Sequence, residues 1–127
     1  MTDLEKTLLE SVPTGLYIAG EWIAAEGDKT FDVRDPATND VVRTIADASP
    51  ADGMKALDAA VAAQDAWAAT PPRTRSDILR RAFDLVQAHK EDLALLMTVE
   101  MGKPLAEARG EVGYGGEFLR WFSEEAV

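Results

Sequence analysis

The hydrophobic pattern of this sequence changes its period once, near Ser49, and that change sets the fold class. Across residues 15–46, apolar and polar side chains alternate and Gly, Asn, Asp and Pro interrupt them, which is typical of short strands and turns. After Ser49, apolar residues recur every three or four positions, which is typical of helices. The sequence therefore predicts an α+β fold in a single domain over residues 1–127. A short antiparallel β-meander at 15–46 is followed by about four α-helices at 49–127.

The strand region contains a predicted hairpin, in which strands at 16–18 and 22–23 flank a tight turn at 19–21. Further on, a polar turn at 35–40 joins a third strand to a fourth. So few and such short strands are only marginally stable by themselves. The sheet therefore needs support from the helices or from a surface outside this chain.

The helices are placed by their capping residues and their prolines. Ser49 can cap a free backbone N–H, and Asp52 suits the positive end of the helix dipole. The proline pair at 71–72 ends that helix, and Thr74 followed by Asp77 repeats the capping pattern. The four predicted helices cover residues 50–69, 74–88, 91–101 and 104–127.

Between the last two helices the sequence predicts a stop and a restart. Gly102 stands where a helix end favours a residue that tolerates positive φ, and Pro104 suits the first turn of the next helix. In the first, third and fourth helices, apolar side chains at helical spacing are expected to face the core. They are Met54, Leu57, Val61, Trp67 and Ala68 in the first helix, Leu93, Leu96 and Met97 in the third, and Leu105, Ala108, Val112, Leu119 and Phe122 in the fourth.

Composition excludes several classes of function. The 127 residues carry a formal charge of −10 with a pI near 4.4, which disfavours contact with nucleic acids and anionic membranes. There is no Cys, and hence no disulfide, thiolate metal site or cysteine nucleophile. The acidic start is unlike a secretory signal, and no apolar run is long enough to cross a bilayer. A soluble cytoplasmic protein is expected.

The polar residues of types found in active sites are expected to have structural roles instead. His89 is the only histidine, and the end of the second helix suits it as a cap or surface residue. A basic cluster of Arg73, Arg75, Arg80 and Arg81 lies near the start of that helix. Arg80 and Arg81 are expected to pair with acids on neighbouring helices, while an anion at the helix start stays possible.

The glycines at 110, 113, 115 and 116 do not form a nucleotide-binding loop. That fingerprint requires a different spacing between a strand and a helix, whereas these glycines fall within a helical period. Glycine is unfavourable inside a helix, so close approach by another backbone is the expected reason for it. The large aromatics Trp22, Trp67, Trp121 and Phe122 are expected in the core. The residues alone form no catalytic or metal-binding group.

Several phrases of the sequence nevertheless resemble one known family. They are LYIAGEW at 16–22, FDVRDPAT at 31–38, AAQDAWAATPPRTRSDILRRA at 62–82, EMGKPLAEARGEV at 100–112 and FLRWFSEEA at 118–126. In this order they resemble the amino-terminal part of the aldehyde dehydrogenase superfamily, and within it the bacterial NAD(P)-dependent succinate-semialdehyde dehydrogenases. The resemblance extends over nearly the whole chain from about Gly15.

The resemblance implies a part of an enzyme. Members of the superfamily oxidise an aldehyde to a carboxylic acid by attack of a cysteine thiolate, hydride transfer to NAD or NADP, and hydrolysis by a glutamate-activated water. Those groups and the Rossmann core follow the region that this chain resembles. The chain is therefore expected to be an inactive amino-terminal fragment that binds no cofactor alone. Its partner is expected to be the remainder of a dehydrogenase, joined or separately encoded, or a second copy of itself through uncovered apolar surface.

A different class of function stays open beside this one. The chain could be a free-standing acidic α+β interaction module without enzymatic activity, which would fold cooperatively and leave no large apolar patch uncovered.

Two further expectations come from the resemblance alone. Some family members hold a monovalent cation at positions that correspond to Arg34 and Glu100, although an empty site is expected here because a downstream ligand is absent. The last helix of the family borders the substrate tunnel, which makes Tyr114 and Phe118 candidates for lining it. The alternative for Tyr114 and Phe118 is a place in the core.

Overall fold

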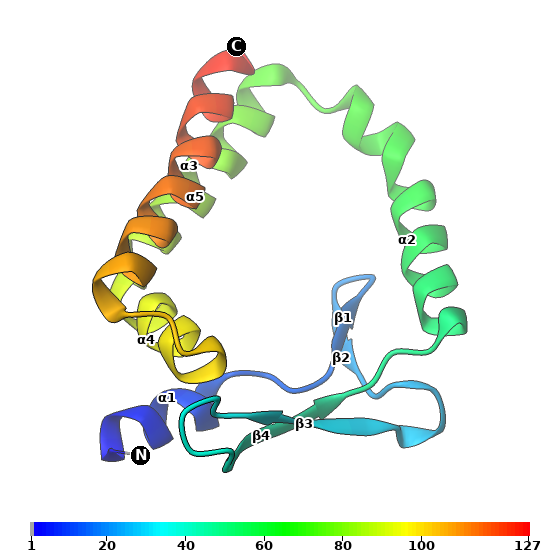
Figure 1. Cartoon of the computed structure of the whole chain (residues 1–127). Helices are drawn as coiled ribbons and strands as arrows, with labels where there is room; N and C mark the ends of the chain where they lie inside the picture. The colour runs from blue at the N-terminus through cyan, green and yellow to red at the C-terminus, as the bar shows by residue number, and fades with distance from the viewer. Residues whose placement is uncertain (1) are drawn as a thin grey trace. The chain divides into compact units, whose positions relative to one another are not determined.

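The computed structural model describes residues 2–127, which belong to two compact units, one reaching to Ala69 and the other running from Thr70 to Val127. The elements of the first unit are α1 (Asp3–Ser11), β1 (Leu16–Ile18), β2 (Glu21–Ile23), β3 (Thr30–Arg34), β4 (Val41–Ala46) and α2 (Pro50–Ala69) (Figure 1). The elements of the second are α3 (Pro72–Ala88), α4 (Lys90–Met101) and α5 (Leu105–Glu125). The predicted α+β class is confirmed. The single domain stays a prediction, and α2 belongs with the strands rather than with the other helices.

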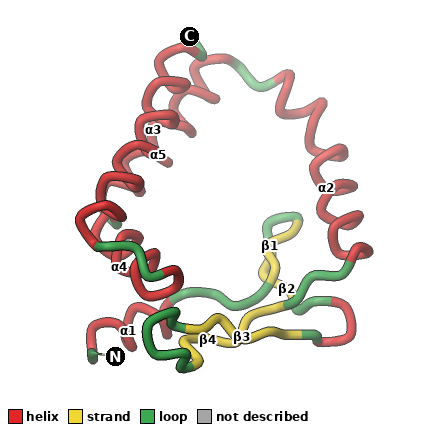
Figure 2. Tube along the Cα trace, in the orientation of Figure 1, coloured by secondary structure: helices red, strands yellow, loops and turns green. Residues whose placement is uncertain are grey.

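The strands form two separate hairpins rather than one continuous meander (Figure 2). In the first, Ala19 and Gly20 both have positive φ, 54° and 88°, which is the turn geometry that matches the twist of paired strands. In the second, Thr30 lies opposite Ala46. Between the hairpins, a 3-10 turn with positive φ at Gly27 and Asp28 redirects the chain, so β2 and β3 do not pair.

Helix α1 was not predicted, although its signal is present in the sequence. The Thr2 hydroxyl accepts a hydrogen bond from the Glu5 N–H, and the Glu5 carboxylate accepts one from the Thr2 N–H at 2.6 Å. This reciprocal arrangement is a capping box. On the inner side of the helix, Leu9 is buried.

The start of α2 follows the prediction, but its apolar face does not. Ser49 Oγ accepts a hydrogen bond from the Asp52 N–H at 3.2 Å, as expected of a cap. Met54, Leu57 and Val61, expected to face the core, are 53–60% exposed. Within the first unit the strands contact α2 only sparsely, chiefly through β1, and these apolar side chains stay uncovered.

The second unit is a three-helix arrangement in which α5 packs along α3 and α4 (Figure 1). Its buried residues are mostly small: Ala94, Ala108 and Val112, with Val86, Met97 and Leu105 packed around them. Helix α3 begins at Pro72, two residues before the predicted start, and its N-cap Pro71 makes no side-chain hydrogen bond. Proline at the first helical position, rather than capping by Thr74, therefore marks this start.

The predicted break between the last two helices is confirmed. Gly102 has φ 74° and its N–H donates to the Thr98 carbonyl at 2.9 Å. Helix α5 then begins directly after Pro104.

The expectation that the large aromatics lie in the core is wrong. Trp22, Trp67, Trp121 and Phe122 are 45–57% exposed, and Leu93 is 38% exposed. Each unit buries only one side of its elements, because the described residues supply no second layer to cover the other side. Helical spacing thus located apolar side chains on the helices, but it did not specify which of them would be covered.

Candidate functional site

The aromatic face of α5 is the first candidate surface. Tyr114, Phe118, Trp121 and Phe122 recur at steps of four, three and one, which places them on one side of a helix. Tyr114 and Phe118 meet edge to face, with ring centroids 5.0 Å apart. They are 70% and 49% exposed, so the alternative of a core position is wrong. Together with Glu117 these aromatics border an open hollow of about 330 Å³.

Ion pairs lie beside this aromatic face on α5. Arg120 Nε lies 2.7 Å from Glu117 Oε2, and its Nη1 lies 3.2 Å from Glu124 Oε1. The hydrogen bond to Glu117 is the main reason that the pKa of Arg120 is raised. Glu124 also lies 3.9 Å from Arg80 of α3, which confirms that Arg80 pairs with an acid of a neighbouring helix. The aromatic face therefore belongs to a helix held by polar contacts beside it.

A second surface is the apolar groove between α4 and α5. It has a volume of about 450 Å³, and Glu100 is the one charged residue in its lining. The other lining residues are Val86, Leu93, Leu96, Met97, Met101, Val112, Gly115, Gly116 and Leu119. This groove could hold apolar side chains, and the carboxylate of Glu100 is the one group in its lining that can exchange a proton.

The glycines of α5 differ in what surrounds them. A Cβ on Gly116 would lie 3.2 Å from Gln87 Nε2 and 3.4 Å from Val86 Cγ1, so side chains of α3 approach it closely. Nothing lies within 4 Å of such an atom on Gly110 or Gly115. A Cβ on Gly113 would lie 3.5 Å from Lys90 Nζ, which is an ordinary contact with a flexible side chain. The expected approach of a backbone is therefore not found within the described residues, and close packing by side chains of α3 is found at Gly116.

Charged residues tie α4 to α5 at the start of both helices. Arg109 forms a two-pronged contact with Glu91, with N···O distances of 2.7–3.1 Å. This hydrogen bonding lowers the pKa of the Glu91 carboxyl and raises that of Arg109. Lys103 also pairs with Glu111. The Arg109–Glu91 contact is exposed and joins the two helices, whereas the Lys103–Glu111 pair joins the loop between them to α5.

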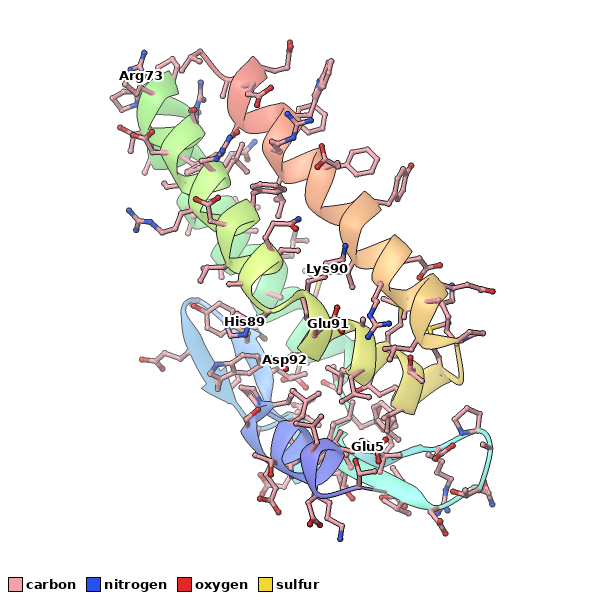
Figure 3. The ribbon with its side chains drawn as sticks, turned by 90° about the vertical axis from the view of Figure 1, so that its left-hand side faces the viewer. Glu5, Arg73, His89, Lys90, Glu91 and Asp92 are labelled. Atoms are coloured by element: carbon pink, nitrogen blue, oxygen red, sulfur yellow. The ribbon has the colours of Figure 1, made fainter. Side chains whose placement is uncertain are left out.

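His89 lies at the junction of α3 and α4, together with Lys90, Glu91 and Asp92 (Figure 3). Its Nδ1 lies 3.2 Å from Asp92 Oδ2, and its side chain is 62% exposed. The interpretation of His89 as a surface residue at a helix end is confirmed. Among residues 2–127, no group of three or more His, Asp or Glu side chains is arranged to hold a metal ion.

The most buried charge of the chain lies in the first unit. Asp52 is 1% exposed, and its carboxylate accepts hydrogen bonds from the Glu26 N–H at 2.9 Å and the Ser49 N–H at 3.0 Å. Lys55 Nζ lies 3.0 Å away. The backbone hydrogen bonds, that of Glu26 foremost, hold the pKa of Asp52 far below its ordinary value. The bond to Glu26 joins residues 26 positions apart, which local sequence patterns do not reveal.

The two residues expected near a cation lie in different units. Arg34 ends β3, where its guanidinium donates to the Asn39 carbonyl at 3.0 Å and pairs with Asp32 at 3.3 Å. Glu100 stands near the end of α4, at the groove. The cation site stays a prediction.

Comparison with known proteins gives these surfaces a context. The model of the aldehyde dehydrogenase family matches residues 22–127. A succinate-semialdehyde dehydrogenase of Paenarthrobacter nicotinovorans is 68% identical over 87 residues, which are 68% of this chain and 19% of that protein. The NADP+-dependent succinate-semialdehyde dehydrogenase of Escherichia coli K12 is 44% identical over 108 residues, which are 85% of this chain and 22% of the relative.

Structural comparison agrees with the sequence matches. The crystal structure of betaine aldehyde dehydrogenase from Staphylococcus aureus in complex with NAD+ matches with a TM-score of 0.91 at 27% identity. The match covers 95% of this chain and 24% of that one. The chain thus spans about a fifth to a quarter of the length of these relatives. Within residues 2–127, no helix is both long and apolar enough to cross a membrane.

Proposed function

The chain belongs to the aldehyde dehydrogenase family, and we propose that it serves as the amino-terminal part of an enzyme that oxidises succinic semialdehyde. The observation that carries this proposal is the 68% identity to a succinate-semialdehyde dehydrogenase. The enzyme would pass a hydride to NAD or NADP, as the names of the E. coli and S. aureus relatives suggest.

Within that enzyme the chain would supply surfaces rather than reacting groups. The 127 residues include no cysteine, so the nucleophile implied by the family lies outside them and the chain alone is not catalytic. Tyr114 and Phe118 would border the path of the aldehyde, because their rings are exposed on one face of α5. Arg34 and Glu100 would border the cation position, which we expect to be empty.

The partner of the chain would be the remainder of the dehydrogenase. Exposed apolar residues on α2 and α5 support this proposal, since such faces need cover. The same faces would favour self-association of the chain by itself. No observation favours the alternative of a free-standing interaction module.

A chimera tests this function. This chain replaces the matched segment of the E. coli relative, and reduction of NADP+ by succinic semialdehyde is followed. We expect turnover by the chimera and none by the 127-residue chain at equal concentration. A folded chimera without activity, or turnover by the chain alone, would contradict the proposal. Replacing the E. coli segment with itself through the same junctions is the control.

A further inference from the structure

Arg120 lies beside the aromatic face of α5, and we propose that it neutralises Glu117 there, so that an aldehyde with a negatively charged group can pass the rings of Tyr114 and Phe118. The inference rests on the proposed function, which takes the aldehyde past these two rings. It adds a residue that helps to select the charge of the substrate. Arg120 is a positioning residue in this account, because it acts on the substrate through Glu117.

The hollow at the aromatic face has one charged residue in its lining, Glu117. The other lining residues, Tyr114, Phe118, Trp121 and Phe122, are aromatic. The Glu117 side chain is 53% exposed, so its carboxylate is accessible to a ligand beside these rings. Like charges repel, and apolar rings screen them less than water does. Without compensation, this lining would therefore disfavour a negatively charged substrate.

Arg120 supplies the compensating charge. Its Nε and its Nη2 both lie 2.7 Å from Glu117 Oε2. Its Nη1 lies 3.2 Å from Glu124 Oε1, so the guanidinium is held by a second carboxylate as well. These acids come three residues before and four residues after Arg120, and both spacings bring side chains together on a helix. Among residues 2–127, Arg120 is the one cation within ion-pair distance of Glu117.

The substrate of the proposed reaction makes this charge relevant. Succinic semialdehyde has a carboxyl group at the end opposite to its aldehyde, and such a group is ionised at neutral pH. Its passage along the aromatic face would bring that negative charge close to Glu117. Exposed ion pairs add little to stability, and the Arg120 and Glu117 side chains are 39% and 53% exposed. The effect of Arg120 is therefore expected in substrate binding rather than in the stability of α5.

Arg120→Gln in the chimera with the E. coli relative tests the proposal. We expect the KM for succinic semialdehyde to rise by about three- to tenfold, because Glu117 keeps its charge and loses its partner. The kcat should change by less than about twofold, since binding is weakened and no reacting group is altered. Arg109→Gln is the matched control. It removes the same charge from α5, but from a pair with Glu91 that lies outside the lining of the hollow, so the KM should stay level.

A double variant separates charge from structure. Glu117→Gln combined with Arg120→Gln removes both members of the pair and leaves no unpaired charge in the lining. We expect the KM of this chimera to return to that of the unaltered chimera. A structural role of Arg120 would not give such a recovery, because the double variant lacks the ion pair just as the single variant does.

The outcomes separate this inference from the proposed function. Equal KM values for the Arg120→Gln and Arg109→Gln chimeras would overturn the role of Arg120, and so would a double variant that keeps the raised KM. An Arg120→Gln chimera that does not fold would overturn it too, because the residue would then be structural. In each of these cases the unaltered chimera still turns over and the proposed function stands. A folded, unaltered chimera without turnover contradicts the proposed function, and the inference falls with it.

Discussion

The two units of this chain are stabilised in opposite ways. In the first, the most buried side chain is the carboxylate of Asp52, which joins the Glu26 turn to the start of α2. In the second, the buried residues are small and mostly apolar, with Ala94, Ala108 and Val112 at the centre. A unit with short hairpins has little apolar surface to bury, so a polar anchor has to fix its geometry. Three packed helices can rely on contact between their faces.

Both units nevertheless share one property. Each leaves a helix with an exposed apolar face, α2 in the first and α5 in the second. The contacts that stabilise each unit thus involve other residues than the exposed apolar faces that could bind a partner. Substitutions at the stabilising residues test this separation.

The largest effect is expected from Asp52→Ala in the first unit. The substitution removes the acceptor of the Glu26 and Ser49 N–H groups and leaves these donors without a partner in a buried place. We expect faster amide hydrogen exchange throughout α2 and a melting transition lower by several degrees, while α5 exchanges as before. Equal losses in both units would mean that they do not have separate anchors.

The same carboxylate makes the first unit sensitive to acid. Its pKa in the folded state lies below the ordinary value of 3.8, so folding is favoured by this group at any pH above that value. The contribution is lost as the pH falls below 3.8 toward the lower pKa of the folded state. Fluorescence of Trp22 and Trp67 should report this loss, and Asp52→Asn should flatten it. An unchanged acid transition in that variant would argue against the anchor.

In the second unit, Val112→Ala should have the next largest effect. Val112 is 8% exposed, and the cavity left by two methyl groups should lower the free energy of unfolding by about 1 to 2 kcal/mol. Chemical denaturation followed by Trp121 fluorescence measures it. Val61→Ala on the exposed face of α2 is the control, where we expect a change within about 0.5 kcal/mol. Similar values for both would contradict the assignment of the core.

Gly102→Ala should have a smaller effect at the break between α4 and α5. Its φ of 74° is unfavourable for alanine, which should cost about 1 kcal/mol. Gly53→Ala in α2 provides the opposite control, because that glycine has open space around it and no positive φ. Thermal unfolding should show a loss for the first variant and no loss for the second. The reverse order would show that the break is not fixed by Gly102.

The smallest effect is expected from Arg109→Gln. The pair with Glu91 is exposed on both sides, and water and salt screen such pairs strongly. The melting temperature should change little, and less still in high salt. A loss as large as that of Val112→Ala would mean that polar contacts, rather than the small apolar core, stabilise the second unit.

Local signals of the sequence predicted most helix ends. Ser49 at the start of α2 and Gly102 at the end of α4 act within one turn of themselves, so their roles could be inferred without a structure. The capping box of Thr2 and Glu5 was equally local, and α1 could have been predicted from it. The double proline before α3 was interpreted correctly as a break, but the helix begins at its second proline rather than at Thr74.

Contacts between residues that are far apart in the sequence could not be predicted from such local signals. The hydrogen bond from the Glu26 N–H to Asp52 depends on how a turn folds back on a helix. The exposure of Trp121 and Phe122 depends on which side of α5 is covered, and helical spacing alone does not specify that. Tyr114 and Phe118 became candidates through family resemblance, and the structure adds that their rings are exposed, meet edge to face and border a hollow.

Amide hydrogen exchange of α5, compared between the 127-residue chain and the chimera with the E. coli relative, tests most directly whether the rest of a dehydrogenase covers this chain. We expect exchange across residues 112–122 to slow by at least about tenfold in the chimera, because docking adds to the stability against local opening. Equal rates in both proteins would contradict the account.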